Sequence, residues 1–439
     1  MLNLDEVRKN IILKDGIYYF DYTASGLAYE PIEKEVLKFL KTYANTHSDS
    51  SSNAILTQRR YENARSELKN LLALNDEFYL VGCGSGASAA IKKFQEIMGL
   101  YIPPNTRKRY NIKAISNLPL VIVGPYEHHS NEVSFREGMC DVLRIGLDED
   151  GGVDFKMLER VLEMNKNREI IASFSAASNV TGVISDYKRI YEMIKAHGGV
   201  LALDASSISA YANVDCNYFD ALFLAPHKLL GGVGSCGLLA IRKSLIDSCE
   251  PTFAAGGTVA YVSRTSHQFV KNFEQLEEGG TPGIIQMIRA NLAYKLRNEI
   301  GFERIKERED ELNELFSKEL ASIDDVICYL PKNLARVPIF AFNVKGVSPY
   351  DFAATLSNDY GIQTRAGCAC AGPYGHDLLN LKDNQTFDKK PGWVRVSLHY
   401  THTKDDVFYL ISAIKKSIEK HKNVWGEELA LHSIFAGKI

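Results

Sequence analysis

The chain has 439 residues, 45% of them hydrophobic and 24% charged, which is typical of a soluble globular enzyme with two or three domains and a large core. Its formal net charge of −3 gives no electrostatic reason to expect nucleic acid or an anionic membrane as a partner. The first residues, MLNLDEVRKNIILKDG, are charged and lack the apolar core of a signal peptide, and no apolar run approaches ~18 residues. We therefore expect a cytoplasmic protein that binds neither nucleic acid nor membranes.

The cysteines argue against a disulfide framework and against a metal site. Eight cysteines are scattered through a long chain, from Cys83 to Cys370, whereas disulfide-stabilised proteins are short and cysteine-dense. Only Cys368 and Cys370 lie close together, as C-x-C, and neither C-x-x-C nor a Cys/His cluster with zinc spacing occurs. We expect no bound metal.

The N-terminal part predicts a strand at 17–22 and an amphipathic helix at 31–43. The apolar face expected for this helix consists of Ile32, Val36, Leu37 and Leu40. The stretch NTHSDSSSN at 45–53 is too polar to pack, so we expect an ordered or substrate-gated loop that contains His47. A second helix should follow from about 57 to 74.

Strands and helices alternate from residue 78 onward. The expected strands lie within 78–86, 118–125, 169–178, 200–203, 219–224 and 237–242. Three helices are expected between them: one that ends near Met98, one at about 157–165 and one at about 187–197. This alternation predicts an α/β domain with a mostly parallel sheet covered by helices on both faces.

The C-terminal part predicts a smaller α+β domain. A long charged helix at 289–322 should leave the large domain, followed by a strand at 337–344 and a helix from Pro349. A loop at 365–375, a strand at 393–398 and a last helix from Thr403 complete it. We assign 16–298 to the large domain and 1–15 with 299–439 to the small one.

Lys228 and Asp204 follow two consecutive buried-strand patterns. Lys228 comes after Phe219–Leu224 and before a glycine-rich loop, and Asp204 ends the run that starts at Val200. Open α/β sheets hold ligands at the carboxyl ends of their strands. A desolvated lysine there is a neutral amine able to form a Schiff base, and the carboxylate can pair with a pyridinium nitrogen. Taken singly, each has a plainer interpretation, a packed lysine stem and a helix cap. Together they predict a pyridoxal phosphate site.

Three further motifs fall at the same predicted sheet edge. The stretch 82–90, GCGSGASAA, lies between a strand and a helix, where free backbone N–H groups and Ser88 can hold an anion, although a plain tight turn is equally consistent. His128, in EHHSN, can stack on a planar cofactor, or the two histidines can simply be surface residues. Asn179, in SNVTG, can hydrogen-bond a ring hydroxyl or serve as a turn residue.

The motifs EHHSN, SNVTG, LALDAS and HKLLGGVG occur in this order along the chain. With this ordered set the chain resembles the class V aminotransferase superfamily of fold-type I pyridoxal phosphate enzymes. Within that superfamily it most resembles the cysteine desulfurase and selenocysteine lyase branch. The resemblance runs from about Phe20 to Ser412. It implies a seven-stranded, mostly parallel sheet in the large domain and a homodimer. By this resemblance, Lys228 is the Schiff-base lysine, Asp204 the partner of the pyridinium nitrogen and His128 the histidine stacked on the cofactor ring. The phosphate loop consists of Gly86, Ala87 and Ser88. Thr281, in EEGGTPG, contacts the phosphate bound by the neighbouring subunit.

The resemblance also implies the substrate chemistry. Cys370, five residues after Arg365, matches the nucleophilic cysteine of the desulfurases, and Arg395 matches the arginine that holds the substrate carboxylate. We add Asn179 and His47 as substrate-binding candidates and expect a sulfur-acceptor protein, since a persulfide must be handed on from an exposed loop. A buried, inert cysteine is the alternative for Cys370.

Several positions depart from the family pattern and leave the substrate open. Ala225 replaces a phosphate-binding serine, Ser207 replaces the glutamine beside the ring hydroxyl, and Cys368 is additional. For His227, cofactor contact and a structural role both stay open. The main hypothesis is cysteine desulfuration. The alternatives are another reaction on the same cofactor (transamination, epimerisation, β-elimination or selenocysteine lysis) and a non-catalytic scaffold.

Overall fold

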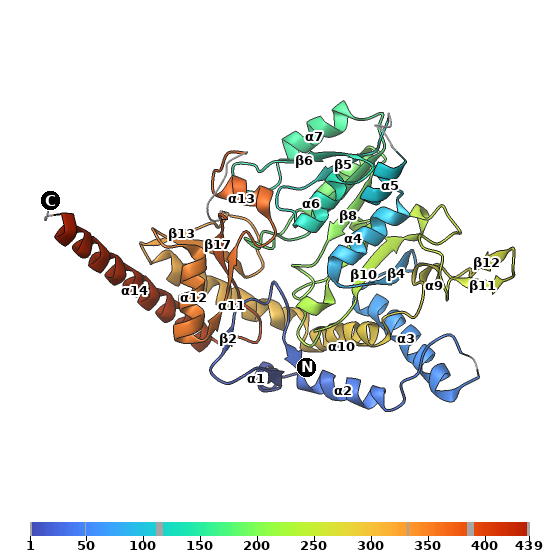
Figure 1. Ribbon diagram of the computed structural model, residues 1–439, viewed down its shortest axis with the longest axis horizontal. Helices are drawn as coiled ribbons and strands as arrows, with labels where there is room; N and C mark the ends of the chain where they lie inside the picture. The colour runs from blue at the N-terminus through green and yellow to red at the C-terminus, as the bar shows by residue number, and fades with distance from the viewer. Residues whose placement is uncertain (1, 49, 111–116, 332, 384–389, 437–439) are drawn as a thin grey trace.

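The computed structural model describes residues 2–48, 50–110, 117–331, 333–383 and 390–436, with side chains up to residue 423. Its centre is a seven-stranded sheet in the order β4-β10-β9-β8-β7-β5-β6 (Figure 1). The strands are β4 (Phe78–Cys83), β10 (Gly237–Arg242), β9 (Ala221–Leu224), β8 (Val200–Asp204), β7 (Ile170–Ser175), β5 (Leu120–Val123) and β6 (Asp141–Arg144). All neighbours pair in parallel except β10, which is antiparallel to both β9 and β4. The predicted mostly parallel sheet is confirmed.

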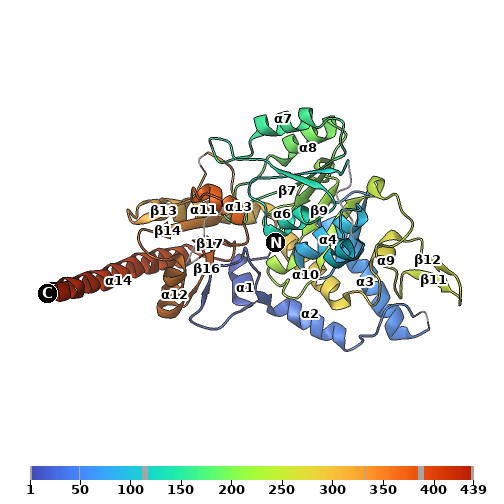
Figure 2. The ribbon, with the colours of Figure 1, turned by 45° about the horizontal axis from the view of Figure 1, so that its top comes forward.

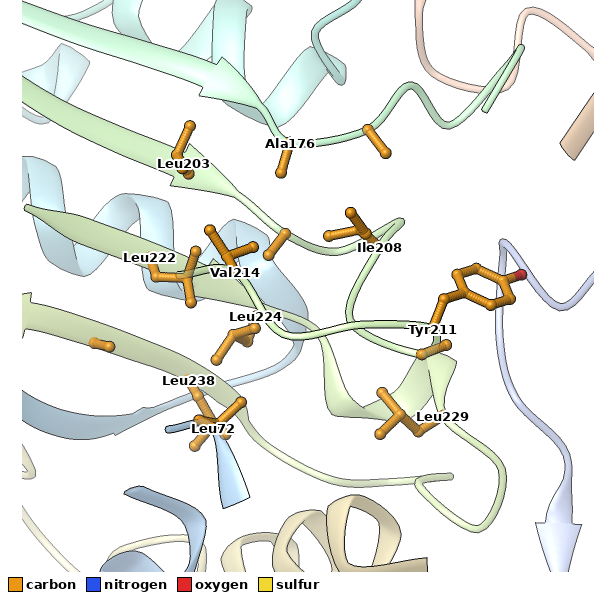
Figure 3. Packing of buried hydrophobic residues seen from close by; sticks show 14 of the residues in the cluster. Leu72, Ala176, Leu203, Ile208, Tyr211, Val214, Leu222, Leu224, Leu229 and Leu238 are labelled. Atoms are coloured by element: carbon orange, nitrogen blue, oxygen red, sulfur yellow. The ribbon is translucent and has the colours of Figure 1, made fainter. Parts of the chain in front are cut away.

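Helices cover both faces of this sheet because its strands are apolar on both sides. Alternate residues enter two clusters: Leu201 and Leu203 of β8 belong to one and Ala202 to the other. The first cluster, part of which Figure 3 shows around Leu203, Leu222 and Leu238, packs under the helices α2 (Glu30–Leu40), α3 (Ser52–Leu71), α7 (Phe155–Met164), α8 (Tyr187–Ala196) and α10 (Ile284–Ile300). The second packs under α4 (Gly86–Ile97), α6 (His129–Arg136) and α9 (Phe273–Glu277). Buried two-faced strands of this kind belong to parallel sheets.

A second, four-stranded antiparallel sheet has the order β13-β14-β17-β16. Its strands are β13 (Val326–Cys328), β14 (Ile339–Val344), β17 (Trp393–Ser397) and β16 (Arg365–Gly367). It shares a separate hydrophobic cluster with α11 (Phe302–Ala321), α12 (Pro349–Tyr360) and α14 (Lys404–Ala436). In both views α14 extends away from the rest of the molecule (Figures 1 and 2).

The remaining elements are short. They are α1 (Leu4–Lys9), β1 (Ile11–Ile12), β2 (Tyr18–Tyr19), β3 (Ala28–Tyr29), α5 (Pro104–Arg109), β11 (Val259–Val262), β12 (His267–Phe269), β15 (Ile362–Gln363) and α13 (Gly372–Leu378), together with three 3₁₀ turns at Cys216–Tyr218, Pro226–Lys228 and Lys243–Leu245. Strand β2 pairs with β15 in a two-stranded sheet, and a bridge from Asp21 to Ser397 at the end of β17 ties the N-terminal segment to the second sheet. Among the described residues, no helix is both long and apolar enough to cross a membrane.

Three sequence predictions need correction. The helix expected at 289–322 is two helices, α10 and α11, separated at Gly301, whose φ of 94° no helix accommodates. On α2 the buried face contains Phe39, whereas Leu37 and Leu40 are 62% and 43% exposed. The loop expected at 365–375 is instead β16, a tight turn and α13, because residues 365–367 pair with β17.

Candidate active site

A cavity of about 780 Å³ opens at one edge of the large sheet. The carboxyl ends of β4, β5, β7, β8 and β9 all reach this edge, since these five strands run in the same direction. Most of the predicted site residues line it: Gly86, Ala87, Ser88, His128, Asn179, Asp204, Ser207, His227, Lys228, Cys370 and Arg395. The fold therefore brings together residues that are distant in sequence, as the strand-end argument predicts.

Lys228 and Asp204 face the cavity from adjacent strands. Asp204 is the last residue of β8 and accepts a hydrogen bond from the Ser206 amide at 2.9 Å. Lys228 ends the 3₁₀ turn that follows β9, and its amine makes no hydrogen bond or ion pair within the described part of the chain. Burial lowers the pKa of Lys228 to about 8, although the Asp204 carboxylate opposes the shift. The lysine is therefore partly neutral, and nucleophilic, near physiological pH.

The start of α4 forms an anion cradle. The helix has 12 residues, and its N-cap residue Ser85 makes no side-chain capping bond, so its first N–H groups have no partner from that side chain. Its first three residues, Gly86, Ala87 and Ser88, line the cavity. Glycine is required here for close approach: a Cβ on Gly86 would lie 2.9 Å from the His227 ring, and one on Gly237 would lie 2.0 Å from the Gly86 carbonyl oxygen. A phosphate is the natural ligand of such a helix N-terminus.

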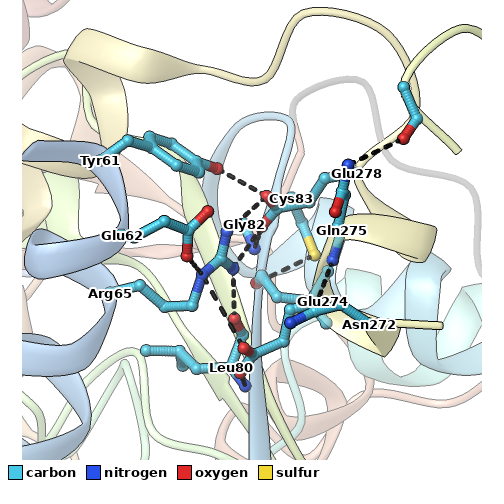
Figure 4. A network of polar contacts seen from close by, with 12 residues as sticks. Tyr61, Glu62, Arg65, Leu80, Gly82, Cys83, Asn272, Glu274, Gln275 and Glu278 are labelled. Atoms are coloured by element: carbon cyan, nitrogen blue, oxygen red, sulfur yellow. Dashed lines mark hydrogen bonds and ion pairs between the residues drawn. The ribbon is translucent and has the colours of Figure 1, made fainter. Parts of the chain in front are cut away.

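A buried ion-pair network lies behind this cradle (Figure 4). The Arg65 guanidinium donates to both carboxylate oxygens of Glu278 at 2.7 Å and to the Leu80 carbonyl at 2.7 Å. Glu278 also accepts from Tyr61 Oη at 2.7 Å and from the Gly82 amide at 2.6 Å. Helix α3 and the segment 274–278 are thereby fixed to the end of β4, from which the glycine-rich loop begins.

His128 forms one wall of the cavity. It caps α6, and its Nδ1 accepts a hydrogen bond from the Ser130 amide at 3.1 Å. Burial lowers its pKa to about 4, so the ring is neutral and carries its proton on Nε2. The preceding Glu127 accepts from the amide and hydroxyl of Ser175 and from Asn131, which fixes this segment to β7.

Arg395 of β17 enters the cavity from the second sheet. Its guanidinium donates to Asp21 at 2.6 Å and to the Asn179 carbonyl at 3.1 Å, while its buried Nε has no partner among the described residues. Arg365, on the neighbouring β16, lies 3.9 Å from Asp21. Asp21 therefore orients both arginines. Sequence reasoning missed it, because an aspartate after a short strand has no distinctive pattern.

Cys370 lies at a tight turn between β16 and α13 and lines the cavity. The Ala371 amide donates to the Cys368 carbonyl at 3.0 Å, and the two central residues, Ala369 and Cys370, have φ of 50° and 59°. This is a type I′ turn built without glycine. Each left-handed non-glycine residue costs on the order of 1 kcal/mol, so surrounding contacts must hold the turn in place.

Two predicted residues are not among those that line the cavity. His47 and Thr281 lie on neighbouring loops of the same chain: Asn45 donates to Thr281 at 3.2 Å, and a Cβ on Gly257 would lie 3.2 Å from the His47 ring. The cavity of one chain is therefore built without these two side chains.

Pyridoxal phosphate fits the residues that are present. The cavity offers a helix N-terminus for phosphate, an amine of lowered pKa and a carboxylate. Five buried polar atoms in its wall also have no partner among the described residues, namely Thr23 Oγ1, Asn179 Oδ1, Ser206 Oγ, Ser235 Oγ and Arg395 Nε. Buried polar atoms without partners indicate a missing ligand or water. The two serines can supply hydroxyls where Ala225 has none. Sequence reasoning did not identify either of them.

Comparisons with known proteins identify the family and the fold. Residues 18–410 match the family model described as Aminotransferase class-V. A probable cysteine desulfurase of Pyrococcus abyssi is 26% identical over 424 residues, which cover 94% of this chain and 98% of that protein. The apo structure of a cysteine desulfurase from Thermococcus onnurineus has a TM-score of 0.81 at 25% identity, over 96% of this chain and 99% of that chain. The cysteine desulfurase CsdA of Escherichia coli shares the fold, with a TM-score of 0.77 at 23% identity over 95% and 99% of the two chains.

Proposed function

Because this chain belongs to the aminotransferase class-V family of fold-type I pyridoxal phosphate enzymes, we propose that it is a cysteine desulfurase. L-cysteine is converted to L-alanine, and its sulfur remains on Cys370 as a persulfide. The observation that carries the proposal is the position of Cys370, in the wall of the same cavity as Lys228, Asp204 and Arg395. Its relatives named probable cysteine desulfurases support the same reaction.

Each part of the cavity has a task toward the cofactor. Gly86, Ala87 and Ser88 would hold the phosphate, Asp204 the ring nitrogen, His128 a ring face and Lys228 the aldehyde carbon. Asn179, Ser207 and His227 complete the set of proposed contacts. When bound, pyridoxal phosphate supplies an electron sink for the substrate α-carbon.

The remaining steps belong to side chains of this chain. Arg395 binds the substrate carboxylate, for which its unpartnered Nε is available. Lys228, whose pKa burial lowers to about 8 so that part of it is a neutral amine, takes and returns the proton at the substrate α-carbon. The Cys370 thiolate attacks the substrate sulfur, so an S–S bond forms as the C–S bond breaks. The electron pair of the broken bond stays with the substrate, which takes up a proton to become alanine.

The test is alanine and sulfide release from L-cysteine in the presence of a thiol reductant, with wild type beside Cys370→Ala. We expect equimolar alanine and sulfide from wild type and neither from the variant. Full activity in Cys370→Ala would assign the chain to another reaction on the same cofactor. No alanine from either protein would rule out cysteine as the substrate.

We further propose a homodimer in which His47 and Thr281 reach the partner's cavity. The two residues share one loop cluster and do not line the cavity of their own chain. Large apolar side chains are exposed nearby and on α2, including Phe253 (72%), Tyr261 (60%) and Leu37 (62%), as expected of a surface that a second copy covers.

We also propose a sulfur-acceptor protein as a partner, because the persulfide on Cys370 must be handed on. We propose a cytoplasmic location as well, which the eight free cysteines support.

A further inference from the structure

The turn Cys368–Ala371 has two non-glycine residues at positive φ, and the elements on both sides of it are fixed in place. On one side β16 pairs with β17. On the other side α13 is anchored by the buried Tyr374, whose hydroxyl lies 3.1 Å from that of Thr181. Fixing the two ends does not fix the backbone between them. Ala369 and Cys370 therefore stay at positive φ only if other contacts restrain the peptide groups of the turn itself.

Three hydrogen bonds restrain these peptide groups, and His129 makes two of them. The His129 amide donates to the Cys370 carbonyl at 2.8 Å, and the Gly372 amide donates to His129 Nε2 at 2.8 Å. Asn179 Nδ2 completes the set by donating to the Ala369 carbonyl at 2.7 Å. His129 thus holds the two peptide groups that follow Cys370, and Asn179 holds the peptide group that precedes it.

The chemistry of the His129 side chain suits this task. An amide can only donate, so Nε2 must be unprotonated, and the low pKa that burial gives His129 favours this neutral form. A Cβ on Gly372 would lie 2.9 Å from Nε2, so the contact requires glycine at this position. His129 is not among the residues that line the cavity, so it acts on the substrate only through the turn.

We propose that His129 is a positioning residue that holds the Cys370 turn in its strained form by accepting the Gly372 amide at Nε2. The consequence for turnover rests on the proposed desulfurase function, because only there does Cys370 attack the substrate. The restraint itself is a property of the fold and can be measured without turnover.

The experiment compares His129→Phe with His129→Gln in the cofactor-bound protein. Phenylalanine keeps the ring shape and removes the acceptor, whereas the glutamine oxygen lies the same number of bonds from Cα as Nε2. The readout is the iodoacetamide reaction rate at Cys370, measured by peptide mass spectrometry against the exposed Cys249 as internal reference. His197→Phe, at a histidine outside the cavity, is the matched control.

We expect Cys370 to react about 3- to 10-fold faster in His129→Phe, as for the loss of one hydrogen bond, and at the wild-type rate in His129→Gln and His197→Phe. Gly372→Ala, which blocks the same contact from the loop side, should also raise the rate. Unchanged reactivity in both His129→Phe and Gly372→Ala would overturn the proposal, as would His129→Gln behaving like His129→Phe.

Turnover separates this inference from the proposed function. With L-cysteine, His129→Phe should lose about 10-fold in kcat at unchanged KM, because a misplaced nucleophile weakens the attack and not substrate binding. His129→Gln should recover kcat. If the alkylation rates follow the expected pattern but wild type forms no alanine, the restraint stands and the proposed function fails. If KM rises and kcat is unchanged, His129 does not position the nucleophile.

Discussion

Burial controls the charge of Lys228, the residue on which the chemistry depends. Its pKa falls from 10.5 to about 8 in the folded protein. Between these two values the unfolded chain binds more protons than the folded chain, so the folded state gains stability as the pH rises. Below about pH 8 the folded protein carries the full cost of a buried ammonium group, on the order of 3 kcal/mol.

The cofactor-free protein tests this directly. We expect Lys228→Met to be more stable than wild type at pH 7, with the difference decreasing between about pH 8 and pH 10.5. Urea denaturation of both proteins across this range gives the free energies of unfolding, and the titrations common to both cancel in the difference. A difference that stays constant with pH would contradict the lowered pKa of Lys228.

The sequence contains enough information to locate the cavity, but not all of its residues. Lys228, Asp204 and His128 were predicted to meet because each follows a strand pattern, and parallel strands end at one edge. Asp21 and Ser235 have no such signal. Asp21 reaches Arg395 across 374 positions of sequence, and Ser235 precedes β10, which runs antiparallel to its neighbours in the large sheet and has its amino end at this edge. Both contributions depend on tertiary pairing that periodicity does not encode.

At the scale of elements, the pair Arg65–Glu278 fixes α3 to β4. Both side chains are nearly buried, at 4% and 5% exposed. We expect Glu278→Gln to cost about 3–5 kcal/mol in the free energy of unfolding, because Arg65 is left buried without a carboxylate. Chemical denaturation measures the loss.

The exposed pair Lys306–Asp310 supplies the control for this experiment. Lys306→Met should change the free energy of unfolding by less than about 1 kcal/mol, as is usual for a solvent-exposed ion pair. Glu278→Gln should also weaken cofactor binding, since the Gly82 amide that Glu278 holds begins the glycine-rich loop. A cost in Glu278→Gln no larger than in Lys306→Met would show that the buried network does not support the fold.

Elements were predicted well where one signal dominates and poorly where two compete. The sequence predicts the buried strands β7, β8 and β9, because each consists mainly of apolar residues. The break at Gly301 was missed, since the apolar period continues on both sides of it. Strand β6 (DVLR) was missed because it is short, polar at its ends and only partly buried.

At the scale of the whole molecule, the two sheets have separate cores. Phe20 packs with the second core and not with the first, although it lies near the N-terminus. The cavity lies where the two parts meet, with Lys228 and Asp204 from the large sheet and Arg395 and Cys370 from the segments around the second. The domain division at 298 and 299 stays a proposal, and the break at Gly301 supports it.

If the active site of the proposed homodimer is shared between subunits, two variants that are each inactive should regain activity when they form a mixed dimer. Lys228→Ala removes a residue that lines the cavity of its own chain. Thr281→Glu places a carboxylate where the proposal has the partner's phosphate, and Thr281 is exposed, so the fold should tolerate it. Each variant alone should be inactive in alanine formation.

Mixed dimers of these two variants contain one intact site, because the Thr281→Glu chain keeps Lys228 and receives Thr281 from its Lys228→Ala partner. Random exchange of equal amounts makes half of the dimers mixed, so we expect about a quarter of the wild-type activity to return. If Thr281 served its own chain, every site in the mixture would be defective and no activity would return. Restored activity therefore identifies the subunit that Thr281 serves, and a fully active Thr281→Glu variant would remove Thr281 from the site altogether.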